Sequence, residues 1–126
     1  MFHIDTAKTI HITRGDIATL KFSAKFRSGE SYLFKKNDIV RFTIVEKNHY
    51  ESMVLKKDVV IDADTETAVV YLHEADTKIG SVINKPKDYW YEVVVNPETA
   101  PQTIIGHDVT GPKIFRMYPE GDDSNG

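Results

Sequence analysis

The chain has 126 residues, a length that fits one domain with a single hydrophobic core. Its formal net charge is −3 and no basic stripe runs along it, so nucleic acid is not an expected partner. Cysteine is absent, which excludes disulfides and thiolate metal sites. The first residues lack the basic and apolar regions of a signal peptide, and no apolar run approaches the about 18 residues of a membrane span. We therefore expect synthesis in the cytoplasm and no membrane partner.

Alternation of apolar and polar residues predicts β-strands along most of the chain. A short strand is expected at 8–13 and a longer one at 17–26, with Leu20, Phe22, Ala24 and Phe26 on its buried face. Residues 32–34 are expected to tuck under the sheets, and residues 56–58 to form a bulge or an exposed edge. The other predicted strands are 38–46, 53–61, 67–72, 89–95, 103–105 and 113–118, and 47–52 is predicted as a polar loop.

The spacing of these segments indicates an all-β fold. Residues 73–79 are predicted as one helical turn that crosses between two sheets, and no longer helical pattern occurs. We predict an antiparallel immunoglobulin-like β-sandwich of about seven to eight strands, formed by residues 1–118. Residues 119–126, which we call the acidic tail, are predicted to be flexible or to serve as a short docking segment.

The tripeptide Arg14-Gly15-Asp16 has the sequence of an integrin-binding motif. A turn between two strands also favours Gly, which tolerates positive φ, and Asp, which can bond its own backbone. We therefore interpret the tripeptide as a structural turn.

The candidate metal and catalytic patterns are sparse. Asp62, Asp64 and Glu66 carry carboxylates that could form a weak calcium site, but a polar hairpin turn explains them better. The histidines show no paired ligand spacing, although distant ones could converge in the fold (His3, His11, His49, His73 and His107). Residues 106–113 lack the Gly-Lys-Ser/Thr ending of a phosphate loop, and no Ser lies in a nucleophile elbow. We expect no cofactor and no enzymatic activity.

The segment around Trp90 is the most aromatic part of the chain. Alternation places Tyr89 and Tyr91 on one face of the strand, and Trp90 with Glu92 on the other. Because Glu92 shares that face, it is expected to be partly wet, where Trp90 would stack on a sugar ring or anchor a protein interface. The alternative is a Trp that packs in the core or at an edge.

Four segments carry a resemblance to a known family: 13–22 (TRGDIATLKF), 38–44 (DIVRFTI), 68–77 (AVVYLHEADT) and 89–95 (YWYEVVV). In this order they resemble small immunoglobulin-like domains of tailed phages and prophages of Gram-positive bacteria. The nearest named relative is the N-terminal domain of the baseplate upper protein family.

This resemblance implies a non-enzymatic structural or attachment protein of a virion or phage-tail-like particle. Its partners would be other virion proteins, including further copies of itself in a symmetric assembly. The resemblance leaves its position in the particle open between baseplate, neck, capsid surface and fibre base. The expected contact surfaces are residues 8–13, the face of Trp90, and the terminal strand with the acidic tail.

Two other functions are kept as alternatives. The first is a carbohydrate-binding module that stacks sugar on Trp90 with help from Tyr50 or Tyr32. The second is a small β-sandwich enzyme or metal-dependent protein, which no motif in the sequence directly indicates.

Overall fold

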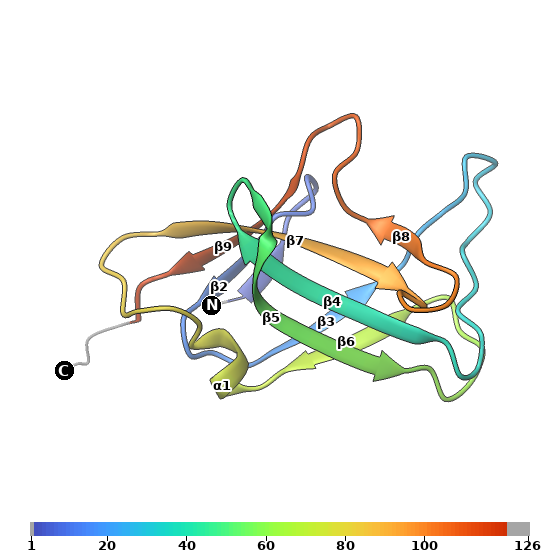
Figure 1. Ribbon diagram of the computed structural model, residues 1–126, viewed down its shortest axis with the longest axis horizontal. Coiled ribbons are helices and arrows are strands. Elements are labelled where there is room, and N and C mark those ends of the chain that lie inside the picture. The colour runs from blue at the N-terminus through green and yellow to red at the C-terminus, as the bar shows by residue number, and fades with distance from the viewer. Residues whose placement is uncertain (1, 121–126) are drawn as a thin grey trace.

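The computed structural model describes residues 2–120, and within that range it consists of nine strands and one short helix (Figure 1). The all-β prediction is confirmed, and the predicted helical turn is present. No described helix has the length and apolar character needed to cross a membrane. The elements are β1 (Phe2–Ile4), β2 (Ile10–Thr13), β3 (Ala18–Phe22), β4 (Ile39–Glu46), β5 (His49–Val60), β6 (Ala68–Leu72), α1 (Glu74–Thr77), β7 (Lys87–Val95), β8 (Gln102–Ile105) and β9 (Lys113–Tyr118).

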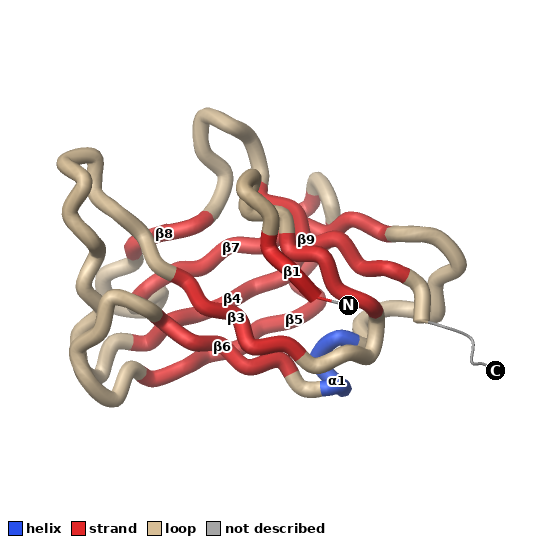
Figure 2. The backbone as a smooth tube through the Cα atoms, turned by 180° about the vertical axis from the view of Figure 1, so that it is seen from behind, coloured by secondary structure: helices blue, strands red, loops and turns tan. Residues whose placement is uncertain are grey.

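The strands form two sheets of unequal size. The large sheet has the order β1-β2-β9-β7-β4-β5, and β8 joins it by pairing with the C-terminal half of β7. The small sheet consists of β3 and β6, which lie over one face of the large sheet (Figure 2). The count of nine strands exceeds the expected seven to eight. One pair, β2 with β9, is parallel, so the arrangement is not purely antiparallel.

The core lies between the two sheets and follows the predicted alternation. Val40, Phe42 and Ile44 of β4 are fully buried, as expected for one face of that strand. The ring of Phe42 lies 5.7 Å from the ring of Phe22 on β3 and 5.7 Å from that of Tyr91 on β7. The contact with Phe22 joins the small sheet to the large one, and the contact with Tyr91 lies within the large sheet. Phe34 is also fully buried, as predicted for the 32–34 connection.

The strand predicted at 17–26 is shorter in the structure. β3 begins at Ala18 and ends at Phe22, after which the chain leaves the sheet. Residues 24–32 form a hairpin, in which the N–H of Tyr32 donates to the carbonyl of Ala24. Phe26 is 54% exposed and does not reach the core. The alternation continues past Phe22 because hairpin backbone is extended too, and sequence period alone does not show which partner an extended segment has.

The N-terminal segment contains a strand that the sequence did not reveal. β1 pairs with β2 at the edge of the large sheet, and its three residues are too few to show alternation. β2 starts at Ile10 instead of residue 8, because residues 5–9 form a tight turn. The Asp5 carboxylate accepts hydrogen bonds from the N–H groups of Ala7 and Thr9, and Lys8 has a φ of 65°.

The hairpin between β4 and β5 differs from the predicted loop at 47–52. The turn is confined to residues 47 and 48, and Asn48 has the positive φ of 69° that such a tight turn needs. β5 therefore begins at His49. It is an edge strand, as expected for residues 56–58, but those residues pair regularly with β4. The pairing is irregular nearer the hairpin, once between Met53 and Leu55 and again between His49 and Met53.

The tripeptide at residues 14–16 is part of a structural turn. The Arg14 side chain is 9% exposed, so it is not displayed for a receptor. Its guanidinium donates to the carbonyls of Lys78, Ile79 and Gly80 and lies 2.7 Å from the Glu120 carboxylate. Arg14 thereby joins the turn before β3 to the segment that leads from α1 to β7.

Candidate functional site

The outer face of the large sheet, opposite the small sheet, carries a row of apolar side chains. Met53, Val45, Trp90 and Ile114 are direct neighbours across β5, β4, β7 and β9. Neighbours in register point to the same side of a sheet, so the four side chains form a continuous row on this face. We call it the outer row.

Trp90 lies at the middle of the outer row and is half-buried. Its ring is 5.2 Å from the ring of Tyr50 and 6.3 Å from that of His107. Val45 beneath them is only 2% exposed, whereas Tyr50 and Met53 are 40% and 54% exposed. Trp90 and its neighbours thus cover Val45 and present an apolar, aromatic surface. The expectation of a partly wet Trp90 face agrees with this arrangement.

The indole N–H of Trp90 is buried, and among residues 2–120 no atom accepts a hydrogen bond from it. A buried donor without a partner costs free energy, since water no longer satisfies it. The rings of Tyr50 and His107 pack around this indole.

Glu92 lies on the same face, one row further along β7, beside Thr43 of β4. Burial raises the pKa of the Glu92 carboxyl above its usual value. Burial also raises the pKa of the Tyr50 hydroxyl, and the negative charge of Glu92 adds to that effect. Gly106 packs closely against Thr103 and Glu92. A Cβ added to Gly106 would lie 2.8 Å from the Thr103 methyl group and 3.6 Å from the Glu92 Cβ.

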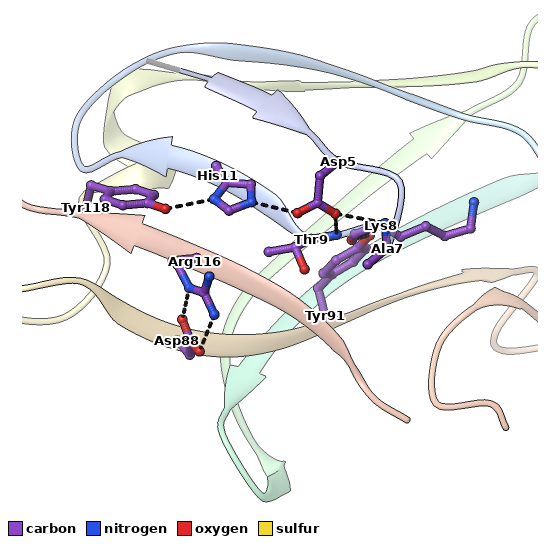
Figure 3. A network of polar contacts seen from close by, with 9 residues as sticks. All are labelled: Asp5, Ala7, Lys8, Thr9, His11, Asp88, Tyr91, Arg116 and Tyr118. Atoms are coloured by element: carbon purple, nitrogen blue, oxygen red, sulfur yellow. Dashed lines mark hydrogen bonds and ion pairs between the residues drawn. The ribbon is translucent and has the colours of Figure 1, made fainter. Parts of the chain in front are cut away.

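A charged row borders the outer row on the side of β2. Arg116 and Asp88 form two hydrogen bonds, of 2.7 and 3.1 Å, between β9 and β7 (Figure 3). The Arg116 guanidinium lowers the pKa of the Asp88 carboxyl. His11, beside Arg116 in register, stacks on His3 of β1 with ring centroids 4.3 Å apart.

His11 is also part of a hydrogen-bonded chain. Its Nε2 lies 2.9 Å from Asp5 Oδ2, and its Nδ1 lies 2.8 Å from the Tyr118 hydroxyl (Figure 3). The hydrogen bond to His11 lowers the pKa of Asp5. Nearby, the Tyr91 hydroxyl donates to the Lys8 carbonyl at 2.5 Å. Together these contacts hold the N-terminal turn against β2, β9 and β7.

On the other side, Arg41 forms the border of the outer face. Its guanidinium makes two hydrogen bonds to Asp58 of β5, at 2.8 and 3.0 Å, and one to Glu98, at 2.9 Å. The outer face therefore has an apolar centre with charged residues on both sides. Protein interfaces share this pattern of an apolar centre within a polar rim.

The structure brings together some of the predicted site residues and separates others. Trp90 and Tyr50 are in contact, as the sugar-stacking alternative required. Tyr32 is not part of this face. Its ring packs between those of Phe26 and Phe34, with ring centroids 5.8 and 5.1 Å away. The contributions of Met53, Ile114 and His107 were missed, because they depend on which strands are neighbours. The alternation of 113–118 does indicate that Ile114 faces away from the core.

The calcium alternative has no structural support. Asp62, Asp64 and Glu66 are exposed, and Asp64 accepts a hydrogen bond from the N–H of Lys36. Within residues 2–120 no group of three or more His, Asp and Glu is placed to hold a metal ion. These carboxylates lie in the exposed connection from β5 to β6, which belong to different sheets, so the expected hairpin turn is not present.

Comparison of the chain with protein-family models, with curated proteins and with solved structures found no match. The site is therefore interpreted from its own geometry, and the phage resemblance stays a prediction.

Proposed function

We propose that this chain is a non-enzymatic structural or attachment module that docks on neighbouring proteins of a phage or prophage particle. The observation that carries the proposal is the outer row: apolar side chains on a sheet face, bordered by Asp88–Arg116 on one side and Arg41–Asp58 on the other. Trp and Tyr are the residue types that contribute most to protein interfaces. A flat apolar centre within a charged rim fits a folded protein surface of similar character.

The strand order supports the immunoglobulin-like part of the proposal. In that fold, strands B and E are neighbours in one sheet, and C, F and G are neighbours in the other. Here β3 and β6 correspond to B and E, while β4, β7 and β9 correspond to C, F and G. The particle context comes from the resemblance of the sequence, and a baseplate, neck, capsid surface or fibre base would each suit such a module.

The test is incorporation into particles. Particles are purified on a density gradient from the organism that encodes the chain, after induction of its prophage, and their proteins are quantified by mass spectrometry. We expect the chain at a stoichiometry comparable with that of major tail or capsid proteins. Absence from particles, with abundant chain left in the lysate, would reject the proposal.

A matched pair of variants locates the docking surface. Met53→Glu places a charge in the outer row at a position that is 54% exposed, so the fold tolerates it. Val69→Glu adds the same charge on β6, at an exposed position away from the outer face. Met53→Glu should be lost from particles and Val69→Glu retained. Equal incorporation of both would show that docking uses another surface.

A carbohydrate-binding module is the second candidate, because the rings of Trp90 and Tyr50 are in contact on an exposed face beside Glu92. It predicts that the wild-type chain binds glycans on an array and that Tyr50→Ala abolishes the binding without lowering the melting temperature by more than about 2 °C. An array without any bound glycan would dismiss this candidate and leave docking on proteins untouched.

A further inference from the structure

A groove with lysines around it opens between the end of β3 and β8. Its wider part, of about 380 Å³, is lined by residues 23–25, by Ile104 and Ile105 of β8, and by Lys8 of the N-terminal turn. A narrower part, of about 90 Å³, continues from Ile105 to Lys21 on β3. We call the two parts together the lysine groove.

The lysines of the groove are not neutralised by the fold. Lys8, Lys21 and Lys25 are exposed, and none of them pairs with a carboxylate among residues 2–120. Other basic side chains of the chain do form ion pairs, for example Lys57 with Asp76 at 2.9 Å. Three uncompensated ammonium groups around one groove produce a positive potential that attracts a negatively charged ligand.

The acidic tail of the chain has the complementary charge. It contains Asp122 and Asp123, next to small residues that let the backbone enter a narrow groove. Both aspartates follow Glu120, which is held by Arg14 at 2.7 Å. Glu120 is therefore the fixed point that precedes the two aspartates.

The acidic tail does not reach the lysine groove of its own molecule. Met117 and Ile105 are opposite Lys87 and Val93 of β7, six residues or about 20 Å apart. Glu120 lies three residues beyond Met117, and β9 runs away from β8 in that direction (Figure 1). Extended backbone carries Asp123 at most about 11 Å from Glu120. The two aspartates therefore lie out of reach of the groove in their own molecule. The groove of a second copy is not subject to this limit.

We propose that the acidic tail of one copy binds in the lysine groove of a second copy, with Asp122 and Asp123 pairing with Lys21 and Lys25. The contact joins two different surfaces, so it is heterologous and repeats head to tail, giving a ring or a filament. It uses neither the outer row nor its rim, and it therefore goes beyond the proposed docking function.

Sedimentation velocity over a concentration series tests the proposal with two charge-neutralising double variants of the full chain. The tail variant is Asp122→Asn with Asp123→Asn, and the groove variant is Lys21→Gln with Lys25→Gln. The control, Lys35→Gln with Lys36→Gln, removes the same charge from exposed lysines outside the groove. Each test variant should weaken self-association about tenfold, since two exposed ion pairs account for about that factor. The control should associate like the wild type.

Mixing the two test variants gives the decisive result. One has an intact groove and the other an intact tail, so an equimolar mixture should form a heterodimer and stop there, at concentrations where each variant alone associates about tenfold more weakly than the wild type. Raising the salt concentration should dissociate it, because the charges are exposed. A wild-type chain that stays monomeric throughout, or a mixture that forms no heterodimer, overturns the proposal. Binding of an unrelated acidic peptide to a monomeric wild type would assign the groove to another protein and also overturn it.

Discussion

Replacing Arg14 by Met tests what this buried guanidinium contributes to stability. The Met side chain keeps most of the apolar stem but removes the donors to the carbonyls of residues 78–80 and to Glu120. Hydrogen bonds to a charged group are worth about 1.5–3 kcal/mol each. The contact to Ile79 is long, at 3.4 Å, and the carbonyls of the exposed residues 78 and 80 regain water, so the sum is reduced. We expect a loss of about 3 kcal/mol.

The assay is urea unfolding, with the melting temperature as a second measurement. About 3 kcal/mol corresponds to about 10 °C for a chain of this size. Glu120→Gln should cost less than about 1 kcal/mol, since the Glu120 side chain is 41% exposed. Arg27→Met is the control, an exposed arginine expected to change stability by less than about 0.5 kcal/mol. If Glu120→Gln were as costly as Arg14→Met, the ion pair and not the carbonyl contacts would be the source of the stability.

Three further predictions concern the outer face. Gly106→Ala should cost about 1–2 kcal/mol in urea unfolding, because its methyl group would lie 2.8 Å from the Thr103 methyl, and Thr103→Ser in the same chain should restore most of the loss. Asp88→Asn should lose about 1 kcal/mol at pH 7, and the loss should shrink as the pH falls below about 3.9, the pKa of an unfolded Asp. Arg116 lowers the pKa of Asp88, so its contribution is present above the unfolded pKa and disappears as pH falls through the folded one. Glu92→Gln should raise the melting temperature at pH 7, because burial raises the pKa of Glu92 and ionisation then opposes folding; the difference should vanish below about pH 4. An equal effect of Glu92→Gln at both pH values would contradict that assignment.

The parts of the fold that were predicted correctly depend on local signals. The alternation of β4 identified Val40, Phe42 and Ile44 as core residues, and the small sheet covers that face of the strand, with Phe22 of β3 against Phe42. The same alternation failed after Phe22, where the chain continues as a projecting hairpin. Phe26 is apolar and correctly spaced, yet it is exposed because no second layer covers it. Burial is decided by the neighbouring layer, which one segment does not encode.

The outer row could be predicted only in part, and the bulge in β5 shows why. Before the bulge Ile44 pairs with Leu55, and after it Val45 pairs with Met53, so Val54 is the extra residue. In a regular ladder Val45 would pair with Val54, and Met53 would point to the opposite face. The extra residue at Val54 therefore brings Met53 beside Val45 and completes the row across four strands. Alternation correctly placed Trp90 outside the core, but the row around it depends on a register change between two strands, which no single segment of the sequence reveals.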